Sequence, residues 1–235
     1  MSKVIVFDLD ETLGYFYELS IIINALETHL GTNISTDDFN KIMELFPEFI
    51  RPNMLTILRY LSRRKANHNI SKVLVYTNNK GPHSWVERII NYFHHKLKSH
   101  LFDQIIGGFR VNGKMTNSLR TTRSKTYADL VRCARLPKKT HVCFIDDQEH
   151  KDMIHDNVYY ICIKPFIYSL DPSQMIKRVY DSKIYTQYTH RQLRIMILDN
   201  FHRHNYNHCV KNNDDLEIDK ITTKRVMTLL QENDF

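Results

Sequence analysis

The sequence has few cysteines and no long apolar run. Its four cysteines show no paired spacing, and two of them lie inside apolar, strand-like runs, where cysteine behaves as a small hydrophobic residue: Cys133, Cys143, Cys162 and Cys209. We therefore expect reduced thiols. No apolar stretch approaches the length of a bilayer span, and the first one ends in acids and lacks the form of a signal peptide. These absences predict an intracellular protein, cytoplasmic or nuclear, without a membrane partner.

The charge of the chain favours an anionic partner. Lys and Arg outnumber Asp and Glu by 33 to 26, which gives a formal net charge of +7. A positive field accelerates association with phosphates and nucleic acids. The alternative is a basic soluble protein whose charges are spread over solvated faces. The net charge therefore favours an anionic partner but does not identify the substrate.

Apolar runs alternate with helical periods along the chain. The runs rich in β-branched residues predict strands at 3–9, 72–77, 103–107, 141–146 and 158–163. Between them, apolar residues recur with helical spacing, as in Met54, Ile57, Leu58 and Leu61. This alternation predicts an α/β fold with a doubly wound parallel sheet and a Rossmann-like core.

Polar residues follow three of these predicted strands at their ends. Asp8 and Asp10 close the first strand, Thr77-Asn78-Asn79 closes the second, and Asp146-Asp147 closes another. Acids and Asn after a strand are ordinary turn and N-cap residues when taken singly. In a parallel sheet, however, all of these strand ends lie along one edge, where ligands bind. The sequence therefore predicts a single site built from three strand ends.

The carboxylates of this edge need a positive partner. Alternate residues of an extended chain share a face, so Asp8 and Asp10 would repel each other unless a cation lies between them. Carboxylates, waters and phosphate are the ligands that Mg²⁺ prefers. One carboxylate can then attack phosphorus, and a second can move the proton of the leaving group. Thr77 offers a hydroxyl to the phosphoryl group, and Lys125, just before a predicted helix, offers a cation.

The motifs at these positions resemble a known family. Asp8-Leu9-Asp10-Glu11-Thr12-Leu13, Tyr76-Thr77-Asn78, Lys125 and Ile145-Asp146-Asp147 are similar to motifs one to four of the haloacid dehalogenase superfamily of phosphohydrolases. The residue sequence of the first two motifs, with the tract 49–55 before a helix, is most similar to the NLI-interacting-factor-like branch. That branch contains the phosphatases of the RNA polymerase II carboxy-terminal domain. The resemblance covers residues 1 to about 165.

The resemblance implies a role for each motif residue. It makes Asp8 the nucleophile and a metal ligand, and Asp10 the general acid and base, with its backbone carbonyl on Mg²⁺. Asp146 would bind the metal directly and Asp147 through water, while Thr12 would brace the loop after the first strand. The chain departs from the branch at Asp147, where the branch often has Asn.

The substrate-binding residues are expected in the second motif and in the basic stretch 110–126. We assign this role to Asn78, Arg120 and Arg123. The candidate lysine lies further ahead of the fourth motif than in the polymerase phosphatases. Arg120 or Arg123 is therefore an alternative to Lys125 as the group that binds the transferred phosphoryl group.

These observations predict a phosphatase core with helical additions. We expect a core over 1–168, a small helical cap over 15–50 and a helical extension over 169–235. The predicted activity is Mg²⁺-dependent hydrolysis of phosphomonoesters through an aspartyl-phosphate, with a phosphoprotein as the favoured substrate. The alternatives are a nucleotide or polynucleotide-end phosphatase and a catalytically weak module that binds protein or nucleic acid. The sequence predicts no oligomeric state.

Overall fold

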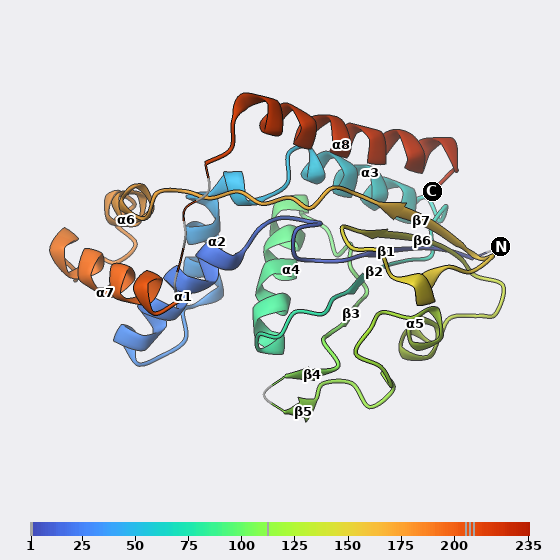
Figure 1. Cartoon of the computed structure of the whole chain (residues 1–235), viewed down its shortest axis with the longest axis horizontal. Coiled ribbons are helices and arrows are strands. Elements are labelled where there is room, and N and C mark those ends of the chain that lie inside the picture. Colours follow the sequence, from blue (N-terminus) through green and yellow to red (C-terminus); the bar gives the residue numbers. More distant parts are fainter. Residues whose placement is uncertain (1, 112, 205, 207, 209) are drawn as a thin grey trace. The chain divides into compact units, whose positions relative to one another are not determined.

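The computed structural model describes residues 2–111, 113–204, 206, 208 and 210–235. Five of its strands form one parallel sheet in the order β3-β2-β1-β6-β7 (Figure 1). The strands of this sheet are β1 (Lys3–Phe7), β2 (Lys72–Tyr76), β3 (Gln104–Ile106), β6 (His141–Asp146) and β7 (Val158–Cys162). The predicted doubly wound α/β sheet is therefore confirmed. A short antiparallel pair follows β3 and consists of β4 (Arg110–Val111) and β5 (Lys114–Met115).

Helices occupy most of the segments between the strands, and the period of Met54, Ile57, Leu58 and Leu61 is confirmed as a helix. Those in the first half of the chain are α1 (Tyr17–Leu30), α2 (Thr36–Glu44), η1 (Pro47–Phe49), α3 (Met54–Ala66) and α4 (His83–Leu97). The others are α5 (Tyr127–Ala134), η2 (Lys151–Met153), α6 (Pro172–Asp181), α7 (His190–Arg203) and α8 (Asn213–Glu232). Within the described part of the chain, no helix has the length and apolarity needed to span a bilayer.

Helices cover both faces of the sheet. Val4 and Val6 of β1 point to a core that includes Leu130 of α5. On the opposite face, Phe7 meets the ring of Phe102. Helices α3 and α8 lie on the side away from α5 (Figure 1). Strands buried on both faces explain the nearly continuous apolar runs of the sequence.

The chain divides into two compact units whose boundaries differ from the predicted ones. The sheet unit consists of 1–14, 51–166 and 217–235, and a helical unit consists of 15–50 and 167–216. The predicted extension over 169–235 is thus not one element of the fold. Its first part joins the predicted cap, and its last part belongs to the sheet unit.

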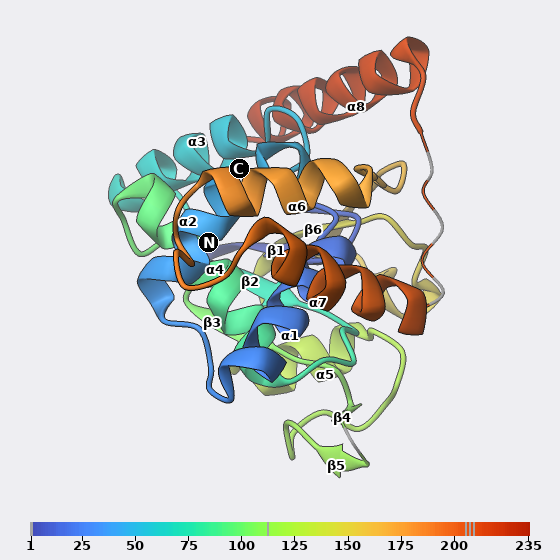
Figure 2. The ribbon, with the colours of Figure 1, turned by 90° about the vertical axis from the view of Figure 1, so that its left-hand side faces the viewer.

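Specific contacts explain this division. In the helical unit, α7 packs against α1 and α6 (Figure 2), and Glu18 accepts hydrogen bonds from the backbone amide of Leu170 and the hydroxyl of Tyr206. In the sheet unit, Lys3 and Arg64 both form ion pairs with Asp234, just after α8. The sequence predicted helices in both segments but contained no information about their partners.

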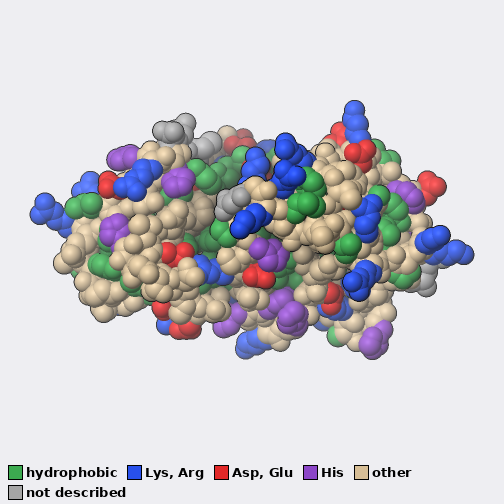
Figure 3. Space-filling model, turned by 90° about the horizontal axis from the view of Figure 1, so that it is seen from below, with side chains coloured by type: hydrophobic (Ala, Val, Ile, Leu, Met, Phe, Trp, Pro, Cys, Tyr) green, Lys and Arg blue, Asp and Glu red, His purple; other side chains and the backbone are tan. Residues whose placement is uncertain are grey.

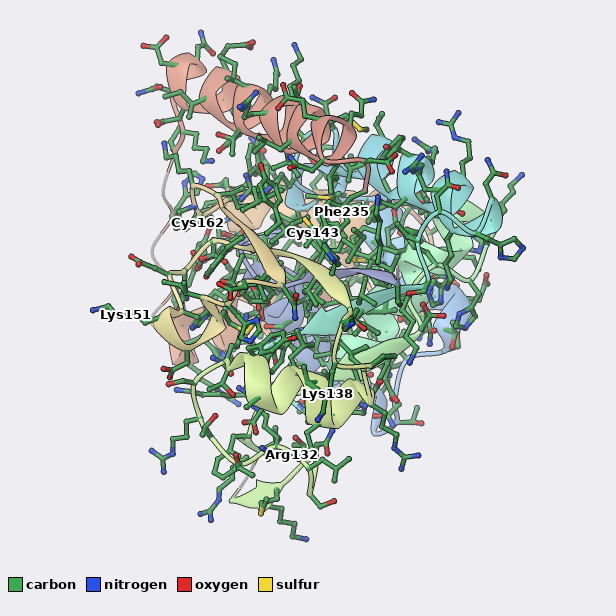
Figure 4. The ribbon with its side chains drawn as sticks, turned by 90° about the vertical axis from the view of Figure 1, so that its right-hand side faces the viewer. Arg132, Lys138, Cys143, Lys151, Cys162 and Phe235 are labelled. Carbon is green, nitrogen blue, oxygen red and sulfur yellow. The ribbon has the colours of Figure 1, made fainter. Side chains whose placement is uncertain are left out.

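The thiols of the described cysteines are free. Cys133 and Cys143 are buried, and Cys162 is exposed. Cys143 lies within β6, and Cys162 ends β7 (Figure 4). Cys209 lies outside the described residues.

Candidate active site

The parallel register places two carboxylates at the same level of the sheet. Phe7 of β1 lies opposite Ile145 of β6, so the residues that follow them, Asp8 and Asp146, lie side by side. The amide of Asp8 donates to the carbonyl of Ile145 at 2.9 Å, which extends the ladder to the nucleophile candidate. Both carboxylates are almost fully buried. The sheet itself therefore fixes their proximity.

Lys125 bridges these two carboxylates. Its Nζ donates to Asp8 Oδ1 and to Asp146 Oδ2, the latter at 2.7 Å, and its side chain is also buried. Charge-assisted hydrogen bonds of this kind are about twice as strong as neutral ones. The structure thus brings together three of the predicted site residues.

The N-terminus of α5 holds Lys125 in place. Thr126 caps this helix by accepting from the amide of Asp129 at 3.0 Å. The amide of Thr126 in turn donates to the hydroxyl of Tyr76, the last residue of β2, at 3.2 Å. The loop that carries Lys125 is therefore fastened to the strand that leads to Thr77.

Thr77 and Asp10 belong to the same pocket and are linked through Asn79. The hydroxyl of Thr77 accepts from the amide of Asn79 at 2.9 Å, and Asn79 Nδ2 donates to Asp10 Oδ2 at 2.8 Å. Asn79 belongs to the second predicted strand end but had no predicted role of its own. Its position after Thr77 was the available signal, since a polar run at a strand end faces the other strand ends.

Asp147 has one carboxylate oxygen that is bonded and one that is not. Thr12 donates to Asp147 Oδ1 at 2.9 Å, which ties the loop after β1 to the end of β6. Asp147 Oδ2 is buried and has no hydrogen-bond partner among the described residues. Ligand oxygens of Asp8, Asp146 and Asp147 lie within 4.8 Å of one another. These hard oxygen donors, one of them buried and unbonded, fit a divalent cation such as Mg²⁺.

Burial and the bridging lysine set the protonation of the paired carboxylates. Burial raises the pKa of Asp8 to about 7, and the ammonium group of Lys125 opposes this rise. Burial also disfavours ionisation of Asp146, but His150, with Nε2 at 3.4 Å from Oδ2, and Lys125 together hold its pKa below the usual value. A further cation in the cluster would lower the pKa of Asp8, because a nearby positive charge favours the carboxylate.

Asp10 differs from these two carboxylates in its surroundings. Burial raises its pKa, while the hydrogen bond from Asn79 opposes the rise. A carboxyl with a raised pKa releases and accepts a proton closer to neutral pH. The environment of Asp10 therefore suits proton transfer.

The structure gives Arg120 a place that differs from the predicted one. Its side chain is fully buried, and its guanidinium donates to the carbonyls of Thr77 and Arg123, each at 3.0 Å, and to Asn78 Oδ1. The cation also lies 4.8 Å from the centre of the Tyr76 ring. Arg120 therefore supports the strand end instead of facing a substrate. Arg123 and Asn78 are exposed, so both remain candidates for substrate contact.

Lys125 and the side chains at the three strand ends contribute to a pocket of about 150 Å³. It is lined by polar residues: Asp8, Asp10, Glu11, Thr77, Asn78, Asn79, Lys125, Asp146 and Gln148. Gln148 and Glu11 had no predicted role. The amide of Gln148 donates to Asp146 Oδ1 at 2.9 Å, so the turn after β6 also orients this carboxylate.

No protein-family model, curated protein or solved structure matches this chain. Membership of the haloacid dehalogenase superfamily therefore stays a prediction, carried by the motifs and by the chemistry of the pocket.

Proposed function

We propose that the protein is a Mg²⁺-dependent phosphatase of the haloacid dehalogenase type, which hydrolyses phosphomonoesters through an aspartyl-phosphate on Asp8. One observation carries this proposal: Asp8 and Asp146, from neighbouring strands, share the ammonium group of Lys125 in a pocket that also contains Thr77 and Asp10. A purely structural ion pair would not need a hydroxyl and a further carboxyl beside it.

The residues divide the work of two displacement steps. In the first step, a carboxylate oxygen of Asp8 bonds to phosphorus as the bond to the leaving oxygen breaks, and Asp10 gives that oxygen its proton. In the second step, Asp10 takes a proton from a water molecule that attacks phosphorus. The bond between phosphorus and Asp8 then breaks, which releases phosphate and restores the carboxylate.

The remaining groups bind the transferred phosphoryl group. Lys125 neutralises charge on its equatorial oxygens, and the hydroxyl of Thr77 orients it. Asp8, Asp146 and Asp147 would hold the metal. When bound, Mg²⁺ supplies positive charge that brings the anionic phosphate and the anionic nucleophile together.

The pocket supports a substrate whose larger part stays outside. All of the lining residues have polar side chains, and the pocket volume of about 150 Å³ suits a phosphoryl group better than a whole nucleotide or peptide. We propose a phosphoprotein as the favoured substrate, with a nucleotide or a polynucleotide end as the second candidate. Lys and Arg side chains occur in several places on the face shown in Figure 3, and the net charge of +7 favours the second candidate as much as the first.

A substrate screen tests this proposal. Phosphopeptides, nucleotides, 3′- or 5′-phosphorylated oligonucleotides and an aryl phosphate would be assayed with Mg²⁺ and with EDTA. We expect hydrolysis only with Mg²⁺ and none by the Asp8→Asn variant, because an amide oxygen is a poor nucleophile. Asp156→Asn, which changes an exposed acid outside the pocket, is the matched control. Full turnover in EDTA would contradict the proposal, and binding of substrates without turnover would favour the binding module.

A further inference from the structure

Arg51 is a buried cation with no part in the proposed chemistry. Only 1% of its surface is exposed, although it lies just before α3 and not in the middle of a helix or strand. Its Nε donates to the carbonyl of Thr12 at 2.8 Å, and its Nη2 donates to the carbonyls of Glu11 and Lys164 at 2.6 and 2.7 Å. Three bonds to backbone carbonyls make the arginine a clamp on the loop that follows β1.

The clamped loop contains a strained residue beside Asp10. Glu11 has a φ of 60°, in the left-handed region that residues with a side chain rarely occupy. Its amide donates to the carbonyl of Gly14 at 2.7 Å, and the amide of Leu13 donates to the carbonyl of Leu9 at 2.9 Å. This tight turn reverses the chain directly after Asp10. The direction of the Asp10 side chain therefore depends on the turn.

A left-handed residue other than glycine persists where its surroundings hold it. The carbonyl of Glu11 accepts from Arg51 and also from the amide of Phe166, at 2.9 Å. The backbone amide of Arg51 itself donates to the carbonyl of Leu13 at 3.1 Å. Arg51 thus bonds to the carbonyls of the strained residue and of the two residues that follow it.

We infer that Arg51 is a positioning residue that holds the left-handed turn at Glu11 and thereby keeps the carboxyl of Asp10 directed into the pocket. The catalytic role of Asp10 in this inference rests on the proposed function, whereas the hold of Arg51 on the turn does not. It predicts that the need for Arg51 falls when residue 11 adopts the left-handed region without strain. Glycine does so about as readily as it adopts the right-handed region.

The surroundings of Arg51 explain how a cation is tolerated there. Burial lowers its pKa to about 10, while the carboxylates of Asp219, Asp147 and Glu11 oppose the fall. The guanidinium therefore keeps its charge at neutral pH. Asp219 comes from α8 and is itself fully buried, so the C-terminal helix contributes to the charge balance of the clamp.

Amide hydrogen exchange of the full chain tests the clamp without using activity. In Arg51→Met, exchange of the amides of Glu11 and Leu13 should accelerate by roughly tenfold or more. A turn that nothing holds in place opens locally more often. Adding Glu11→Gly to Arg51→Met should recover part of this loss. If Arg51→Met does not fold, Arg51→Lys, which can reach fewer carbonyls, should show the same change to a smaller extent. Unchanged exchange in the folded variants, or no recovery with Glu11→Gly, would overturn the inference.

A second measurement links the clamp to Asp10. With an aryl phosphate, Arg51→Met should lower kcat by about 10²-fold with little change in KM, because a displaced catalytic group affects the transition state more than binding. Adding Glu11→Gly to this variant should raise kcat again by roughly tenfold. That factor corresponds to the backbone strain that glycine removes. A rise in KM with unchanged kcat would contradict a positioning role.

Arg178→Met is the matched control. Arg178 donates to the carbonyl of Leu45 and pairs with Glu48, within the helical unit. Its loss should leave the exchange of Glu11 and Leu13 unchanged, and Glu11→Gly should not improve that variant. If the unmodified protein hydrolyses no phosphomonoester, the proposed function fails while the exchange experiment still decides the clamp.

Discussion

The ammonium group of Lys125 lies 2.7 Å from Asp146 Oδ2 and also bonds to Asp8, so one buried cation serves two buried carboxylates. The three groups carry a net negative charge when all are ionised. Burial is the main cause of the raised pKa of Asp8, and the charge of Asp146 adds to a rise that Lys125 opposes. The net negative charge leaves room for a second cation.

Removal of Lys125 should make stability depend on Mg²⁺. Breaking a buried ion pair costs about 3–5 kcal/mol, because the remaining charge is left uncompensated. We therefore expect Lys125→Met to unfold at a lower temperature than the unmodified protein in EDTA, and to gain more from added Mg²⁺. Thermal unfolding with EDTA and with Mg²⁺ measures both effects. Lys3→Met, which removes an exposed pair with Asp234, should cost at most about 1 kcal/mol and show no such gain.

The Asp10→Asn variant should accumulate a phosphorylated intermediate. An aryl leaving group needs little protonation, so phosphorylation of Asp8 should survive, whereas loss of the general base should slow hydrolysis by about 10²–10⁴-fold. Hydroxylamine-sensitive, acid-stable phosphate bound to the protein would reveal the intermediate. Absence of trapped phosphate together with a sharp loss of Mg²⁺ affinity would instead make Asp10 chiefly a metal ligand.

Arg120 and Arg123 should respond differently to substitution. Arg120→Met leaves the carbonyls of Thr77 and Arg123 without their donor, and we expect a loss of about 3 kcal/mol in the free energy of unfolding. Its kcat/KM should fall for small and large substrates alike. Arg123→Ser changes an exposed residue, so stability should shift by at most about 0.5 kcal/mol. Urea unfolding and steady-state kinetics would show whether the two variants separate in this way.

A selective effect on large substrates is expected for Arg123→Ser alone. Its KM for a phosphopeptide should rise more than its KM for an aryl phosphate, which is too small to reach an exposed arginine. Equal effects on both substrates would assign Arg123 to the transferred phosphoryl group.

His94 should weaken the fold in acid. Its Nε2 accepts from the amide of Phe102 at 3.1 Å, and burial, together with His100 and Lys65, lowers its pKa from 6.5 to about 4. Between these values the unfolded chain binds a proton that the folded protein does not, so stability falls as the pH drops from 6.5 towards 4. In His94→Gln this part of the acid loss should disappear. Urea unfolding at pH 7.5 and 5 would measure it, with the exposed His95→Gln as control.

The geometry of the strand ends could be predicted from the sequence because a parallel sheet leaves little choice. Once 3–9, 72–77 and 141–146 were assigned as strands, Asp8, Thr77 and Asp146 had to lie at one edge. The position of Lys125 followed from the helix that precedes the third of these strands. Each prediction used only local periodicity and the rule of parallel pairing.

The burial of Arg120 and Arg51 could not be predicted in the same way. Both cations form most of their hydrogen bonds with backbone carbonyls, and carbonyls are present at every position of any sequence. The division of the C-terminal residues between the two units could not be predicted for a related reason. An amphipathic period shows which face of α6, α7 or α8 is buried but does not identify what covers it.

The hydrogen bond between Leu13 and Arg51 has a consequence for how such a protein can diversify. The chain leaves the sheet unit after Gly14 and re-enters it at Arg51, whose amide bonds to the carbonyl of Leu13. It leaves again after Phe166, whose amide bonds to Glu11 of the same turn. These ends of the sheet unit are held by bonds within that unit, so the inserted segments can change in length or be exchanged at little cost to the pocket. The helical unit can therefore diverge in sequence while the side chains of the pocket stay where the strands put them.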